Sequence, residues 1–399
     1  MRNKMTAALA LVCLSVFLPC AARAAEADKD KSGVERPVTS QEIDQLKNEI
    51  YDETHSSVEG IFDAHGESGD LNNKLNFWRY GARLNLQRGG DITFYAIGTH
   101  TLYHTLGDYL DESGTNFTFG LKARKSSRST FQFEAGGTTF STNRTNVNAM
   151  GSFTFTPAPQ TSFYVTASRT NVEESLLSAT GLRPVGGPFA GRLVGNVMDN
   201  RLTGGLTHRF DNRFDVYAEG AFGARAGSNV DSDFFKRVNG GVGYSLIARS
   251  DEDMLSLVRA SYAIDYFGYA DNRLGFGGAS LITRGGNPIA LNRLGEDGIS
   301  PVPTAFQPGI GGYFSPANFL SNTFRLDVKG RAGREVSYKA SAFAGWQNFT
   351  GSSDRGAVGL SGSLIFHVSD HVAIPVTYLR DNVGPFTQQT FFGRLAVTF

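Results

Sequence analysis

Cysteine is nearly absent from this sequence, and methionine and tryptophan are scarce. The 399 residues include two cysteines, five methionines and two tryptophans. Both cysteines, Cys13 and Cys20, lie in a segment that we expect to be removed, so the mature protein would have none. This excludes disulfides, thiolate metal sites and a cysteine nucleophile. A lipoprotein processed at Cys20 is a weaker alternative, because Pro19 stands where a small residue is expected.

Long apolar runs and an excess of one charge are also missing. Hydrophobic residues make up 40% of the chain and the mean hydropathy is −0.22, which is too polar for a helical membrane protein. Basic and acidic residues number 38 each, and residues 1–24 hold three basic and no acidic ones. The mature chain would therefore carry 35 basic and 38 acidic residues, a net charge of −3. This balance argues against nucleic acid as a partner.

The first residues have the features of a cleaved secretory signal. A basic start is followed by an apolar run over residues 7–18, and Ala22 and Ala24 supply small side chains at the positions that signal peptidase reads. The run is too short to span a membrane, and no stop-transfer pattern follows it. We therefore predict a signal peptide over residues 1–24.

A charged tail follows over residues 25–55. Ile43, Leu46 and Ile50 recur at helical spacing, and Ser40 is placed to cap the first turn. The sequence predicts a short periplasmic helix here. It would serve as a tether, with a plug or docking helix as the alternative.

From about residue 56 onward apolar and polar residues alternate with a period of two. In 117–124 and 324–331, aromatic and aliphatic side chains alternate with polar or charged ones. Successive side chains of a strand point to opposite faces, so each segment has one apolar and one polar face. We predict an all-β outer-membrane barrel over 56–399 with about sixteen antiparallel strands, most of them long enough to span a membrane. The predicted strands are 56–65, 74–86, 91–105, 116–125, 129–140, 146–156, 161–170, 199–209, 213–224, 234–248, 254–268, 319–331, 335–347, 356–368, 371–381 and 388–399.

The connections between these strands differ in length according to their parity. One set is short and turn-like, whereas the alternate set contains the long stretches 171–198 and 269–318. Outer-membrane barrels have short periplasmic turns and longer external loops. This predicts that both termini lie in the periplasm. The terminal Phe399 resembles the C-terminal signal of such barrels, which also indicates the cell outer membrane.

If the apolar faces contact lipid, the charged residues of the alternate parity line the lumen. An Arg or Lys facing lipid at mid-depth would cost about 2–4 kcal/mol. The inward charges have mixed sign and predict no strong ion preference. We propose as lumen residues on the substrate path Tyr217, Glu219, Arg259, Asp265, Arg325, Asp327, Lys329, Phe343 and Arg394. The aromatic rings among them would either face sugars or pack within the wall.

The spacing of histidines and nucleophiles selects no catalytic set. His100 and His104 share one strand face, but no nearby carboxylate completes a metal site. We therefore predict neither an enzyme nor a metal or cofactor.

Three segments in or near the long connections resemble a known family. They are 173–181 (EESLLSATG), 267–272 (FGYADN) and 311–316 (GGYFSP). In this order they resemble the C-terminal barrel domain of the cellulose synthase operon protein C (BcsC-type) family, without its tetratricopeptide repeats. The motif residues singled out as a loop gate are Ser175, Leu177, Ser178, Gly181, Tyr269, Asn272, Gly311, Gly312, Tyr313, Phe314, Ser315 and Pro316.

The resemblance implies a sixteen-stranded outer-membrane channel that exports cellulose or a related β-glucan made by an inner-membrane glycan synthase. The expected partners are outer-membrane lipid, the polysaccharide chain, that synthase and a separate periplasmic repeat protein, since about thirty residues precede the predicted barrel. Residues 274–308 look like an insertion, and Ile310 stands where the family usually has histidine. The loop constriction is therefore expected to differ from that of the family.

The 269–318 connection is the predicted gate. The Gly311-Gly312 pair permits tight turns and Pro316 would fix one edge of a lid over or in the pore. Two other functions remain open at this point. A general diffusion porin would conduct without a synthase, and an outer-membrane enzyme would show a Ser, His and acid cluster at one rim.

Overall fold

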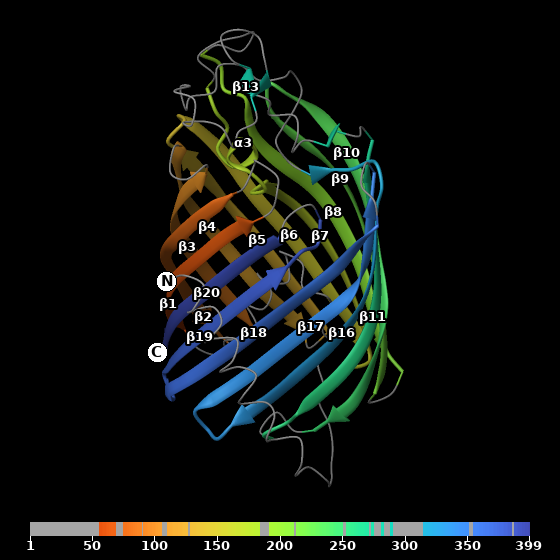
Figure 1. The fold of residues 1–399 in the computed structure, drawn as a ribbon. Coiled ribbons are helices and arrows are strands. Elements are labelled where there is room, and N and C mark those ends of the chain that lie inside the picture. Colours follow the sequence, from red (N-terminus) through yellow and green to blue (C-terminus); the bar gives the residue numbers. More distant parts are fainter. Residues whose placement is uncertain are drawn as a thin grey trace, which may run out of the picture.

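The computed structural model forms one closed barrel of antiparallel strands (Figure 1). It describes residues 56–68, 75–89, 91–105, 110–126, 128–183, 191–210, 213–249, 253–270, 273–274, 281–282, 288–289, 314–350, 354–384 and 387–399. The signal peptide and the helix of the 25–55 tail lie outside these residues. Within them, no helix is long and apolar enough to cross a membrane.

Sixteen strands make up the barrel wall, as the alternation predicts. They are β1 (Ser57–Ser68), β2 (Asn76–Arg88), β3 (Ile92–Thr105), β4 (Leu110–Ser126), β5 (Ser129–Phe140), β6 (Arg144–Ala158), β7 (Thr161–Asn171), β8 (Gly195–Arg209), β9 (Phe214–Ser228), β10 (Val230–Ala248), β11 (Leu257–Tyr269), β16 (Phe319–Ala332), β17 (Val336–Phe349), β18 (Arg355–Ser369), β19 (Val372–Asp381) and β20 (Thr387–Thr398). The connections carry the short helix α3 (Leu176–Ala179) and four two-residue strands, β12 (Arg273–Leu274), β13 (Leu281–Ile282), β14 (Pro288–Ile289) and β15 (Phe314–Ser315).

The first and last strands of the wall pair with each other. β1 runs antiparallel to β20 from Ser57, opposite Thr398, to Ser68, opposite Thr387. Just beyond this register the Phe399 N–H donates to the carbonyl of Ser56 at 2.9 Å. Closure leaves no strand edge open in the wall, so its backbone polar groups are paired without water.

The outer face of the barrel is apolar and the inner face is polar. Phe119 and Phe324 are each 68% exposed on the outside, although they are large and hydrophobic. Arg259 and Asp327 face inward and are 2% and 1% exposed. This distribution is the reverse of that in a water-soluble protein, and it requires a lipid environment around the wall.

The strands extend further than predicted at the end that carries α3. β4 begins at Leu110 rather than at residue 116, and β9 and β10 are joined through the single residue Asn229. The predicted connection at 225–233 is therefore wrong. Asn229 has a φ of 51°, a left-handed conformation that asparagine tolerates in a tight turn. The longest connections, β7–β8 and β11–β16, still lie at one end, with α3 and β13 (Figure 1).

Candidate channel interior and its closing segment

All nine residues predicted to line the lumen lie at inward-facing positions of the wall. β9 carries Tyr217 and Glu219, and β11 carries Arg259 and Asp265. Arg325, Asp327 and Lys329 lie on β16, Phe343 on β17 and Arg394 on β20. They do not form one site but are spread around the wall.

Three of these residues, Arg259, Arg325 and Asp327, form one ionic network with Asp215. The Arg259 guanidinium donates to both carboxylate oxygens of Asp215, at 2.6 and 3.0 Å, and lies 3.4 Å from Asp327. Asp327 also accepts from Arg325 at 2.5 Å and from the Ser341 hydroxyl at 2.6 Å. The two cations balance the two anions, and their hydrogen bonds are charge-assisted. The network joins β9, β11, β16 and β17.

Arg259 reaches Asp215 by crossing an intervening strand. Asp215 lies on β9 and Arg259 on β11, with β10 between them. The guanidinium passes over Gly243 of β10, where a Cβ atom would overlap it. A glycine is therefore required at this position for the bridge to form.

The remaining predicted lumen residues contact neighbouring strands. Arg237 pairs bidentately with Asp265, at 2.9 and 2.6 Å, and Arg394 pairs with Asp63 at 2.6 Å. Glu219 accepts a hydrogen bond from the Tyr164 hydroxyl.

The two predicted aromatic residues lie against glycines of the next strand. Tyr217 covers its cross-strand partner Gly241, and Phe343 covers Gly359. These rings pack against the wall, as the second interpretation of the sequence expects.

The connection between β7 and β8 carries the first sequence motif and folds against the inner wall. We call residues 172–183 the closing segment. Its helix α3 is capped by Ser175, whose hydroxyl accepts from the Ser178 N–H, and Ser178 bonds back to the Ser175 N–H at 2.9 Å. Gly181 ends the helix with a φ of 73°, which glycine adopts without strain. Leu176 and Ala179 pack in a buried cluster that includes Phe77 and Tyr103 of the inner wall.

Glu173 binds the closing segment to one side of the barrel. Its carboxylate accepts two hydrogen bonds from Arg79 of β2, at 2.6 and 2.7 Å, and a third from the Tyr103 hydroxyl of β3, at 2.7 Å. Burial alone would raise the pKa of Glu173, but the adjacent Arg79 cation and these hydrogen bonds outweigh it and lower this pKa below its usual value. The carboxylate therefore stays ionised over the ordinary pH range.

Glu174 binds the closing segment to another side of the barrel. Its carboxylate lies 2.7 Å from a guanidinium nitrogen of Arg225, on β9. β2 and β9 are seven positions apart in a ring of sixteen strands, almost half the circumference. Two adjacent glutamates are thus tied to nearly opposite walls. The closing segment therefore lies across the lumen and not along one side.

Arg225 and Tyr269 together connect the three sequence motifs. The Arg225 guanidinium lies 5.4 Å from the ring centre of Tyr269, a cation–π contact, while it pairs with Glu174. The Tyr269 N–H donates to the carbonyl of Pro316 at 3.0 Å. Of the third motif, Ser315 is buried, and Phe314 is described only in its backbone. Asn272, Gly311, Gly312, Tyr313 and most of the predicted 269–318 gate lie outside the described residues.

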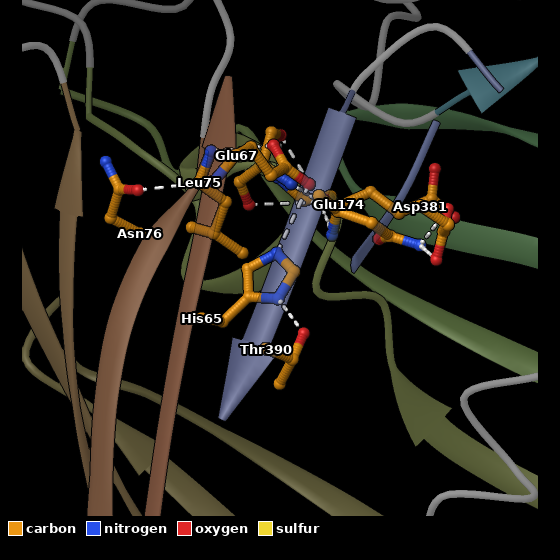
Figure 2. A network of polar contacts seen from close by, with 10 residues as sticks. His65, Glu67, Leu75, Asn76, Glu174, Asp381 and Thr390 are labelled. Carbon is orange, nitrogen blue, oxygen red and sulfur yellow. Dashed lines mark hydrogen bonds and ion pairs between the residues drawn. The ribbon is translucent and has the colours of Figure 1, made fainter. Parts of the chain in front are cut away.

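A second polar network lies at the same end, on the strands that close the barrel (Figure 2). His65 bonds the Thr390 hydroxyl at 2.8 Å and lies 3.4 Å from the Glu67 carboxylate. Glu67 accepts from the Leu75 N–H at 2.9 Å and lies close enough to Glu174 to interact electrostatically. The closing segment thus also faces β1.

This cluster combines a hydroxyl, a histidine and a carboxylate, as a hydrolase triad does, but the hydroxyl belongs to a threonine and the geometry is that of a strand pair. His65 and Thr390 are direct cross-strand partners in the β1–β20 register. The His65 ring stacks on Phe77 with 5.1 Å between ring centres, and Thr390 is 7% exposed. These contacts hold the barrel closed. No group of residues suited to a metal ion occurs within the described part of the chain.

An apolar outer face, an ionic inner face and full strand closure define a transmembrane β-barrel of the outer-membrane type. Residues 81–277 match the family described as "Cellulose synthase operon protein C C-terminus (BCSC_C)". This match confirms the family resemblance that the motifs indicate, and the first two motifs lie within it. No curated protein matches the chain.

A solved structure shows the same barrel fold. A protein titled "Bacterial polysaccharide outer membrane secretin" aligns with a TM-score of 0.60 and 9% identity, over 88% of this chain and 100% of that one. CdiB from Acinetobacter baumannii aligns at a TM-score of 0.42 and 10% identity, over 86% of this chain and 60% of that one. OccK5 (OpdH) of Pseudomonas aeruginosa aligns at 0.39 and 10% identity, over 86% and 98%. The family match and the first of these structures support an outer-membrane barrel.

Sequence reasoning does not identify the residues that hold the closing segment. Arg225 has the same inward parity on β9 as Tyr217 and Glu219, and this parity is the signal that indicates it. The 173–181 motif contains Glu173 and Glu174, but the sequence does not show their partners. Their partners lie on distant strands, and only the register of the closed barrel brings them into reach.

Proposed function

We propose that this protein is an outer-membrane channel for the export of a polysaccharide, cellulose or a related β-glucan made by an inner-membrane synthase. One observation carries the proposal: two of the family motifs meet at Arg225, where Glu174 holds a segment across the lumen, and the third motif binds Tyr269. A neutral polymer needs a polar path without a strong field of one sign. The balanced ion pairs of the inner wall offer such a path.

The closing segment favours a gated exporter over a general diffusion porin. A segment tied to nearly opposite walls obstructs passive diffusion and must move before a chain can pass. In this proposal both termini lie in the periplasm, and a separate periplasmic repeat protein links the barrel to the synthase. The predicted lumen residues line the path, and the 269–318 connection acts as an outer gate. The proposed activity involves no catalysis.

Deletion of the gene tests the function. Secreted glucan, stained with a β-glucan-binding dye, is expected to fall to background in the deletion strain and to return on expression of the wild-type chain. Synthase activity measured in isolated inner membranes serves as the control and is expected to be unchanged. Normal polymer secretion in the deletion strain would contradict export and favour the porin function.

A further inference from the structure

The lipid-facing surface of the barrel has a hollow on β4 to β7 that differs from the rest of the outer wall. Its volume is about 370 Å³, and its lining is almost entirely apolar. Two rows of paired residues form it. One row runs from Leu121 and Phe133 to Gly151 and Ala167.

The other row of the hollow consists of bulkier side chains. It runs from Ala123 and Phe131 to Phe153 and Val165. Small side chains at Gly151, Ala167 and Ala123 form the floor, and the Phe rings stand beside it. A Cβ atom added at Gly151 would meet no heavy atom within 4 Å, so the floor is open.

Basic residues lie at one end of this hollow. Lys125 follows Ala123 by two residues, where the β4–β5 register shifts, and Arg128 lies in the turn that follows. Both are exposed. Lys125 lies about 7 Å beyond Ala123, given the rise of a strand. The opposite rim carries Arg169, whose guanidinium is engaged with the Val147 carbonyl at 3.2 Å and with Asn200 at 2.6 Å.

The distances suit one membrane lipid with an anionic headgroup. Ser129 and Phe155 are cross-strand partners next to the turn, and Gly151 lies on β6 four residues away from Phe155, on the side away from the turn. This is roughly 13 Å of strand, which an acyl chain spans. A phosphate at the turn would be within reach of two flexible cations, while its acyl chain fills the hollow.

We propose that this hollow is a binding site for an anionic glycerophospholipid. Lys125 and Arg128 bind the phosphate, and the Gly151 floor holds one acyl chain between Phe133 and Phe153. The turn lies at the same end of the barrel as both chain termini. With the termini in the periplasm, as proposed above, it meets the phospholipid leaflet. The site is independent of the cargo of the channel.

Native mass spectrometry of the full protein in detergent tests the site. Phosphatidylglycerol and phosphatidylcholine with the same acyl chains are added, and the bound lipid is counted. The wild type is expected to retain one phosphatidylglycerol in preference to phosphatidylcholine. The variant Lys125→Glu/Arg128→Glu is expected to bind phosphatidylglycerol roughly 30-fold more weakly, because each cation near a membrane surface contributes to binding an anionic lipid.

Variants that fill the floor test the contribution of the apolar hollow separately from that of the two cations. Gly151→Leu is expected to abolish retention of the lipid. Gly220→Leu is the matched control, because Gly220 is exposed on β9 and a Cβ there also meets no heavy atom within 4 Å. Ala167→Leu fills the same hollow in case Gly151→Leu does not fold. Heat-dependent mobility on a gel reports a folded barrel for each variant.

Three results would overturn the site. The first is equal retention of both lipids by the wild type. The second is equal retention of phosphatidylglycerol by Gly220→Leu and the floor variants. The third is preferential binding of lipopolysaccharide that Lys125→Glu/Arg128→Glu leaves unchanged. The last result would place an anionic headgroup at the opposite rim. This test does not measure glucan secretion. Its outcome therefore stays valid even if the proposed polysaccharide cargo is wrong.

Discussion

The two glutamates of the closing segment are expected to contribute unequally to closure. Glu173 accepts three hydrogen bonds, two of them from Arg79, and both side chains of this pair are about one quarter exposed, at 22% and 27%. Charge-assisted bonds at this intermediate burial contribute between the values for surface and buried pairs, so Glu173→Gln is expected to cost the closed state about 2 kcal/mol. This raises the open-to-closed ratio roughly thirty-fold.

Glu174 forms an ion pair with Arg225, and its side chain is 32% exposed. Such a pair contributes about 1 kcal/mol or less, so Glu174→Gln is expected to raise the same ratio by roughly five-fold. The closed state should therefore depend more on the β2 contact than on the β9 contact.

Single-channel recording in planar bilayers measures the open probability of each variant. Glu335→Gln is the control, because Glu335 is exposed in the turn at the other end of the barrel. A double-mutant cycle of Arg79→Gln with Glu173→Gln isolates the pair, and its coupling should account for most of the effect of the single change. Equal effects of the two glutamate variants, or an open probability unchanged in both, would refute the reasoning that these ion pairs hold the lumen closed.

Three further predictions follow from the contacts of the inner wall and the long connection. The pKa of Glu173 is lowered below its usual 4.5, so its contribution to closure is fully present above pH 4.5 and is lost only as pH falls through the lower pKa of the closed state. The open probability should therefore stay constant from neutral pH to about 4.5 and rise below that pH. A rise that begins above pH 4.5, or one that persists in Glu173→Gln, would contradict this prediction. Arg259→Gln should destabilise the barrel by about 3–5 kcal/mol, because buried Asp215 loses its bidentate cation. Gly243→Ala should act through the same contact, whereas at Gly362 an added Cβ meets open space, so Gly362→Ala is the control. Urea unfolding followed by tryptophan fluorescence measures all three, and equal midpoints for the two glycine variants would argue against the bridge. Deletion of 274–316 should raise the open-state conductance if the long connection gates the pore, and an unchanged conductance would remove that role.

The strands could be predicted because lipid and lumen impose strict alternation on each of them. A one-residue error would turn Arg325 and Asp327 toward lipid, so the register of β16 follows from its sequence. Strand ends above the membrane are under no such constraint. The predicted connection at 225–233 is too long for this reason, and the left-handed turn at Asn229 shows how short the true one is.

The closing segment could not be predicted in the same way. Its motif is visible in the sequence, but Arg79 and Glu173 are 94 residues apart. Their contact depends on the curvature of the closed wall, which places β2 almost opposite β9 with the closing segment between them. Local patterns carry no information on that curvature. The family resemblance places Ser175 and Gly181 in a predicted loop gate, but it does not show that they cap and end α3.

The pairing of β1 with β20 has a consequence for the order of assembly. His65 and Thr390 are 325 residues apart, and the whole seam joins partners of similar separation. Hairpins from β1–β2 to β19–β20 need only local contacts, whereas the seam must wait until every strand has been synthesised and inserted. Contacts of such long range form slowly. Until the seam forms, β1 and β20 expose unpaired strand edges, and the assembling barrel depends on a factor that protects them or pairs with them.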